Sequence, residues 1–162
     1  MKILFITANR VGDAVLTTGL LSWLEKKYPD ASFTIACGPY GADLFRAVPR
    51  LERLIVMTKK KYNGHWFDLW KTCVGTKWDL IVDMRNSLAS RMLYAKKFAA
   101  LRRSPGKHKV VENAAVLKLS PPPNPHIWIT PEAEREAEKL LPKNASILAL
   151  GPAANWPLTQ WP

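Results

Sequence analysis

The sequence of 162 residues contains only two cysteines, Cys37 and Cys73, and three histidines. Their spacing does not match the ligand spacing of a zinc site, and no CxxC pair is present. A disulfide framework and a redox dithiol are therefore excluded, and both thiols are expected to be buried in a reduced protein. We expect neither a metal nor an organic cofactor.

Long apolar runs are also missing. No stretch approaches the ~20 residues that a transmembrane helix needs, and the apolar run at residues 3–6 is too short for a signal-peptide core. We therefore expect a cytoplasmic protein. Acidic residues are scarce: 13 Asp and Glu stand against 24 Lys and Arg, a net charge of +11. This excess favours an anionic partner, whether nucleic acid, anionic lipid or a phosphorylated substrate.

Apolar residues make up 48% of the chain, enough for a substantial core. Hydrophobic patterns of strand and helix alternate throughout, which predicts an α/β fold: a Rossmann-like parallel sheet of about five to seven strands with helices on both faces. The first strand should be interior. The expected strands are 2–8, 32–37, 54–57, 79–84, 99–103 and 147–150. The expected helical segments are 16–28, 41–48, 66–73, 87–97, 110–119 and 130–141.

The loop after the first strand ends in Asp13, at the mouth of the first helix. Its only glycine, Gly12, predicts a tight turn but matches neither the dinucleotide fingerprint nor a phosphate-binding Walker loop. Asp13 has two interpretations: a helix N-cap, or an ionised carboxylate that faces a cleft and acts as a general base. Arg10 either binds an acceptor phosphate or carboxylate, or pairs with Asp13.

A second group of candidates follows the strand at residues 79–84. Ligands of doubly wound sheets bind at the carboxyl ends of the strands, so Arg85, Asn86 and Ser87 are expected to line the same cleft. The alternative is an ordinary turn with Ser87 as a helix cap. Asp83, inside the strand, is either a second cleft carboxylate or a buried group with hydrogen-bond partners.

Three segments of the sequence carry a resemblance to a known family. They are residues 10–18 (RVGDAVLTT), 78–85 (WDLIVDMR) and 147–162 (ILALGPAANWPLTQWP). In this order and spacing they resemble glycosyltransferase family 9, which includes the heptosyltransferases of lipopolysaccharide biosynthesis. The resemblance covers essentially the whole chain.

The resemblance implies a GT-B enzyme that moves a sugar from a nucleotide-sugar by an inverting, metal-independent reaction. The donor would be ADP-heptose or a similar compound, and the acceptor an anionic, lipid-linked saccharide at the inner face of the cell membrane. Asp13 would be the catalytic base. Arg10, Gly12, Arg85 and Asn86, together with Ser87, would contact the acceptor.

The same resemblance implies two domains. Residues 1–144 would form the acceptor-side domain, and residues 145–162 would begin an incomplete donor domain. Gly151 and Thr159 would lie on the donor side, where Thr159 stands at a position at which the family often has a phosphate-binding lysine. We expect residues 1–162 alone to be inactive.

Two alternative hypotheses remain beside the enzyme. The positive charge by itself would suit a nucleic-acid-binding α/β domain, and half of a transferase fold could also serve as a non-catalytic scaffold. The sequence has no Arg- or Asn-rich recognition helix, zinc framework or aromatic RNP-type strand. We therefore expect no nucleic-acid partner and, at most, peripheral contact with the membrane.

Overall fold

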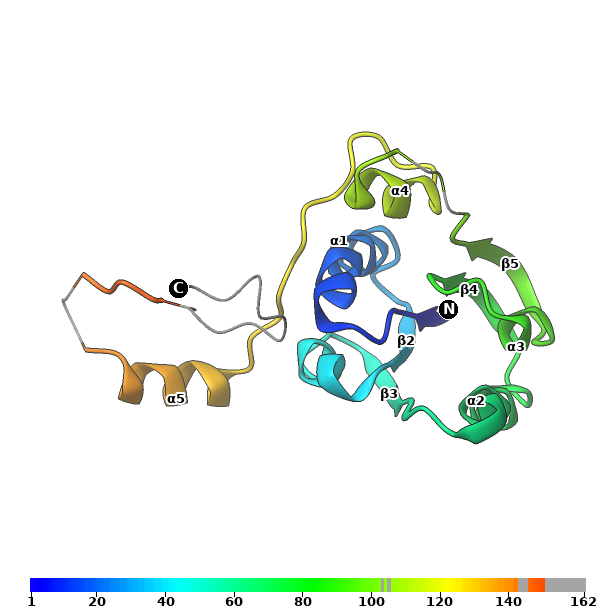
Figure 1. The fold of residues 1–162 in the computed structure, drawn as a ribbon, viewed down its shortest axis with the longest axis horizontal. Coiled ribbons are helices and arrows are strands. Elements are labelled where there is room, and N and C mark those ends of the chain that lie inside the picture. The colour runs from blue at the N-terminus through cyan, green and yellow to red at the C-terminus, as the bar shows by residue number, and fades with distance from the viewer. Residues whose placement is uncertain (103, 105, 143–145, 151–162) are drawn as a thin grey trace. The chain divides into compact units, whose positions relative to one another are not determined.

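The computed structural model describes residues 1–102, 104, 106–142 and 146–150. The chain divides into two compact units, Met1–Trp128 and Ile129–Pro162 (Figure 1). The first unit contains the sheet and most of the helices, and the second contains one described helix. The expected domain boundary between residues 144 and 145 lies outside the described residues and stays a prediction.

The first unit is built on one parallel sheet of five strands in the order β3-β2-β1-β4-β5. The predicted fold class is confirmed. So is the interior position of the first strand, which pairs with β2 on one side and β4 on the other. The strands are β1 (Lys2–Ile6), β2 (Ser32–Cys37), β3 (Leu51–Val56), β4 (Trp78–Asp83) and β5 (Ala95–Ala100).

Helices cover both faces of this sheet, α1 on one side and α2 and α3 on the other (Figure 1). The helical elements of the first unit are α1 (Val11–Lys27), the 3-10 helices η1 (Pro39–Phe45) and η2 (Lys61–Asn63), α2 (Gly64–Cys73), α3 (Leu88–Arg91) and α4 (Lys109–Ala115). The second unit contains α5 (Pro131–Leu140), which Thr130 caps by accepting a hydrogen bond from the backbone of Ala133, as its sequence predicts.

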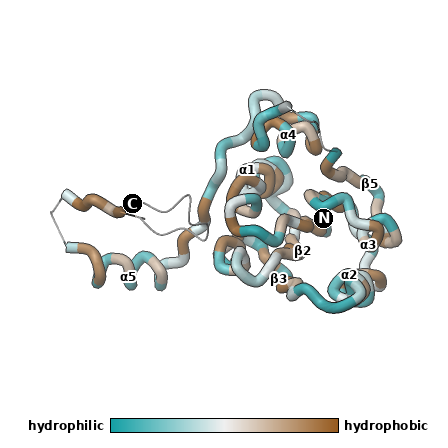
Figure 2. The backbone as a smooth tube through the Cα atoms, viewed as in Figure 1, coloured by the Kyte–Doolittle hydropathy of each residue, from teal (hydrophilic) through white to brown (hydrophobic). Residues whose placement is uncertain are grey.

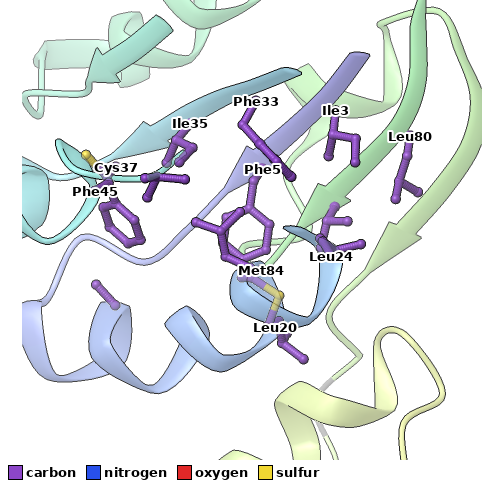
Figure 3. Packing of buried hydrophobic residues seen from close by; sticks show 14 of the residues in the cluster. Ile3, Phe5, Leu20, Leu24, Phe33, Ile35, Cys37, Phe45, Leu80 and Met84 are labelled. Atoms are coloured by element: carbon purple, nitrogen blue, oxygen red, sulfur yellow. The ribbon is translucent and has the colours of Figure 1, made fainter. Parts of the chain in front are cut away.

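The alternation of side chains along each strand divides the core into two layers. Ile3 and Phe5 of β1 pack with Leu20 and Leu24 of α1 (Figure 3). Residues 4 and 6 of the same strand point to the opposite face, where they pack with Leu69 of α2. Both cysteines are buried in these layers, and burial raises the pKa of each thiol to about 11, so both thiols are protonated at neutral pH.

The proline-rich stretch after α4 runs across α1, and two hydrogen bonds hold it there. The backbone amide of His126 donates to Thr18 Oγ1 at 3.0 Å, and Trp128 Nε1 donates to the Glu25 carboxylate at 3.0 Å. Between these contacts, Gly19 faces the backbone carbonyl of Asn124, which would lie 2.6 Å from an added Cβ. Residues 123–128, called the strap below, thus require glycine at position 19.

Replacing Gly19 by alanine is expected to lower the free energy of unfolding by about 1–3 kcal/mol, because the added methyl group forces the strap away from α1. Gly12→Ala on the same helix is the matched control, since a Cβ added there would meet no atom within 4 Å. That variant should keep or slightly raise the stability, because alanine favours a helix. Urea denaturation checks both, and equal midpoints for the two variants would contradict the prediction.

The predicted helix at residues 87–97 begins as expected but is too long. The helix α3 ends at Arg91, and residues 95–100 form the edge strand β5, which pairs with β4 from Trp78 to Asp83. Lys96 and Lys97 give this strand the polar composition that concealed it, and such composition is typical of an exposed sheet edge. Pairing with β4 therefore overrides local propensity, and the predicted strand at 99–103 begins four residues earlier.

The predicted strand at residues 147–150 is also absent. The described residues 146–150 form no strand. The stretch is apolar, as its brown colour in Figure 2 shows, yet Leu148 and Leu150 are 82% and 78% exposed. An apolar run becomes a strand only where a neighbour accepts its backbone hydrogen bonds.

Candidate functional site

The carboxyl ends of β1 and β4 meet at one edge of the sheet, where the chain leaves the two strands toward opposite faces. This is the switch point at which doubly wound sheets bind ligands. A cavity of about 750 Å³ lies here and is called the Asp13 cavity below. Its polar lining consists of Asn9, Arg10, Asp13, Thr17, Arg85, Asn86, Lys109 and Asn113.

Asp13 lies in the first turn of α1 and lines this cavity. The N-cap interpretation is wrong: Arg10, in extended conformation, occupies the cap position, and the Asp13 carboxylate makes no capping bond. Asp13 is half-buried and has no hydrogen bond or ion pair with any residue in the described part of the chain. Because the positive end of the helix dipole favours an anion here, the carboxylate is available to a ligand.

Cationic side chains line the same cavity as this carboxylate. Arg10 is exposed and lines the cavity, and no ion pair joins it to Asp13 within the described residues. Lys109 reaches the cavity from α4, where it also pairs with Glu112 at 2.8 Å. A ligand that brings negative charge into this cavity therefore meets cations on at least two sides.

Arg85 forms a wall of the cavity. Its guanidinium donates to Asn9 Oδ1 at 2.7 Å and lies 4.5 Å from the centre of the Trp66 ring. Burial lowers its pKa, and the nearby Asp83 carboxylate opposes that shift. Arg85 thus links the loop after β4 to the loop after β1 and fixes the position of one loop relative to the other.

Asn86 and Ser87 differ in what they contribute. Asn86 lines the cavity in the left-handed region, with φ of 52°, and its Oδ1 accepts a hydrogen bond from Arg91 at 2.6 Å. Ser87 does not line the Asp13 cavity; it is the N-cap of α3, as the alternative interpretation proposed, and accepts a hydrogen bond from the Ser90 amide.

Asp83 is a structural carboxylate and not a second cleft group. It is fully buried and accepts hydrogen bonds from the Arg85 amide, the Ser87 amide, the Ser87 hydroxyl and the Ser90 hydroxyl, at 2.8, 2.6, 2.7 and 2.7 Å. This network fixes the turn that carries Arg85 and Asn86. Asp83 therefore positions these two lining residues without lining the cavity itself.

Gly12 is the second residue of α1 and does not line the cavity. Its φ is not left-handed, and a Cβ at this position would meet no atom within 4 Å. The predicted tight turn at Gly12 is therefore wrong, because the helix begins at Val11. The two donor-side candidates, Gly151 and Thr159, lie outside the described residues.

Four polar lining residues were not predicted as site residues from the sequence. Asn9 precedes the motif at residues 10–18 and Thr17 lies within it, whereas Lys109 and Asn113 come from α4, which packs against α1. Asn113 Nδ2 donates to the Leu16 carbonyl at 3.3 Å, which anchors α4 beside the cavity. No local pattern in the sequence connects Lys109 with the cavity. Its place in the cavity depends on tertiary packing.

The described residues contain no group of three or more His, Cys, Asp and Glu that could hold a metal ion. Among the helices that the structure describes, none is long and apolar enough to cross a membrane.

Comparison with solved structures places this fold beside family 9 glycosyltransferases. The glycosyl transferase family 9 protein of Veillonella parvula DSM 2008 aligns with a TM-score of 0.77 and 18% identity, over 99% of this chain and 56% of that one. E. coli heptosyltransferase WaaC with ADP aligns at 0.68 and 16%, over 100% and 61%. E. coli ADP-heptose lps heptosyltransferase II aligns at 0.60 and 16%, over 86% and 50%.

The chain therefore spans 50–61% of the length of these structures, as expected for one half of a GT-B fold. At this level of identity the likeness shows the fold. No protein-family profile and no curated protein sequence matches the chain significantly.

Proposed function

We propose that this chain is the acceptor-binding part of a glycosyltransferase that transfers a sugar, heptose in the first instance, from a nucleotide-sugar to a phosphorylated saccharide. The observation that carries the proposal is the unpaired Asp13 carboxylate, held at the start of α1 in a cavity with Arg10 and Lys109. The fold likeness to family 9 enzymes, two of which are heptosyltransferases, supports it.

The chemistry follows from the position of this carboxylate. Glycosyl transfer with inversion needs a base that takes the proton of the acceptor hydroxyl while its oxygen attacks the anomeric carbon of the donor. The C–O bond to the nucleoside diphosphate then breaks, and the diphosphate leaves with the bonding electrons. Asp13 takes the proton. This sequence of events requires no metal as base or nucleophile.

The cations around Asp13 select the acceptor. Arg10 and Lys109 would hold the acceptor's phosphate or carboxylate groups, and charge-assisted hydrogen bonds of this kind fix orientation as well as affinity. Holding the acceptor hydroxyl beside the carboxylate is what makes the transfer effectively intramolecular. The net charge of +11 suits an acceptor that resides at an anionic membrane surface, with the protein bound peripherally at its cytoplasmic face.

The donor is proposed as ADP-heptose or a close analogue, because one aligned WaaC structure contains ADP and another contains ADP-2-deoxy-2-fluoro heptose. The test is transfer of radiolabelled heptose from ADP-heptose to a phosphorylated lipopolysaccharide-core acceptor, by the protein expressed from its complete reading frame. Label should appear in the acceptor, with and without EDTA. Absence of transfer from ADP-heptose and from other nucleotide-sugars alike would refute the proposal.

A further inference from the structure

Residues of α2, of α3 and of the chain segments next to them line a second cavity. These two helices lie on the face of the sheet opposite α1 (Figure 1). The cavity has a volume of about 610 Å³ and is called the α2–α3 groove below. Its apolar lining consists of Trp66, Phe67, Trp70, Leu88, Ala89 and Met92. Three of these apolar side chains are largely exposed to solvent: Phe67, Leu88 and Met92 are 63%, 74% and 63% exposed. A groove of this size and composition is typical of a site that takes an apolar ligand.

Two polar groups of the groove are engaged within the protein. The Ser87 hydroxyl donates to Asp83 at 2.7 Å, and the Arg85 guanidinium donates to Asn9 at 2.7 Å. The buried Trp70 Nε1 has no hydrogen-bond partner among the described residues. A saccharide needs several free donors and acceptors to replace its hydrogen bonds with water. Most of the lining residues are apolar, so the groove favours a hydrocarbon chain over a sugar.

The groove and the Asp13 cavity share one lining residue, Arg85. The Arg85 guanidinium lies over the Trp66 ring, so its charge stands at the junction between the cationic cavity and the apolar groove. The exposed residues 59–61, all lysine, lie just before Asn63 at the rim of the groove. This order of cationic cavity, arginine junction and apolar groove matches an amphiphile that has an anionic head and a hydrocarbon tail.

We propose that the α2–α3 groove binds the hydrocarbon chain of the lipid-linked acceptor while the anionic saccharide head of the same molecule occupies the Asp13 cavity. The proposal rests on the proposed function for the identity of the acceptor. It adds that the acceptor's lipid contributes to binding through Leu88, Met92 and the aromatic side chains of α2, and that Arg85 contacts the molecule where head and tail join.

The binding test uses alkyl phosphates below their micelle concentrations, titrated into the complete protein by calorimetry. Dodecyl phosphate should bind at least about tenfold more tightly than octyl phosphate, because each buried methylene adds favourable transfer free energy. Inorganic phosphate should bind most weakly. Equal affinities for the octyl and dodecyl compounds would overturn the proposal.

Variants locate the tail. Leu88→Gln and Met92→Gln should each weaken dodecyl phosphate binding severalfold and leave the affinity for inorganic phosphate unchanged. Tyr94→Gln is the matched control, because Tyr94 is 63% exposed but lines neither cavity. A loss of equal size in the Tyr94 variant would mean non-specific surface binding and would overturn the proposal. So would self-association in sedimentation velocity that Leu88→Gln abolishes, since the groove would then be an interface between copies.

Failure of this proposal and failure of the proposed function give different results. Alkyl phosphate binding that depends on chain length, without heptose transfer, would support the lipid-binding groove and refute the proposed transferase activity. Equal transfer to acylated and deacylated acceptors, with alkyl phosphate affinity independent of chain length, would support the transferase activity and refute the lipid-binding groove.

Discussion

Replacing Asp13 by asparagine is expected to lower kcat of the complete enzyme by about 10²–10⁴-fold, the usual effect of removing a general base. The amide is nearly isosteric with the carboxylate but cannot accept the proton of the acceptor hydroxyl. Because Asp13 caps no helix and pairs with no described residue, its loss removes no structural contact. KM for the acceptor should change far less than kcat. Initial rates at saturating donor measure both.

The control for this variant is Asp30→Asn. Asp30 is exposed, follows α1, and lines neither cavity. It should leave kcat within about twofold of the parent value, as for surface substitutions without a named role. Circular dichroism and urea midpoints should be unchanged for both variants. A near-normal rate for Asp13→Asn would show that another group takes the proton.

Replacing Asp83 by alanine is expected to lower the free energy of unfolding by about 3 kcal/mol. The carboxylate accepts hydrogen bonds from the amides of Arg85 and Ser87 and from the hydroxyls of Ser87 and Ser90, in a fully buried position. Its loss leaves the two amides and the Ser87 hydroxyl without this acceptor, whereas the Ser90 hydroxyl keeps the Ser87 carbonyl at 3.0 Å. Each buried donor left without a partner costs about 1–3 kcal/mol unless water replaces the carboxylate. Urea denaturation monitored by tryptophan fluorescence gives the difference.

Asp43→Ala is the comparison for that measurement, because the Asp43 side chain is 90% exposed and only pairs with Arg46 at the surface. Its effect should stay within about 0.5 kcal/mol. Asp83→Ala should also weaken acceptor binding, because the network holds the turn that presents Arg85 and Asn86. A loss of less than about 1 kcal/mol would mean that water enters and satisfies the donors.

Hydrophobic pattern was sufficient to predict the centre of the sheet and insufficient to predict its edge. The apolar runs in β1 and β4 are buried on both faces, so composition alone identified both as strands, and β1 as an interior one. β5 has the sequence AKKFAA, and its residues 96–98 are exposed. An edge strand of this kind is specified by the neighbour that it pairs with, and one sequence does not show that neighbour.

The site was predicted to the extent that it is local in sequence. Asp13, Arg10 and Arg85 follow the carboxyl ends of two strands, and a parallel sheet brings those ends together. Lys109 enters the same cavity only because α4 packs on α1, which no local pattern shows. The N-cap interpretation of Asp13 failed because the helix begins earlier: its N-cap is Arg10, three residues before Asp13.

The helix α1 carries both the cavity residue Asp13 and the contacts with the strap. Its 17 residues form a rod of about 25 Å. Near its start it carries Asp13, and along its remaining length it holds the strap through Thr18 and Glu25. One helix therefore carries both the carboxylate of the cavity and the contacts that hold the strap. Arg85, on the other side of the cavity, belongs to the loop after β4 and is anchored separately through Asp83.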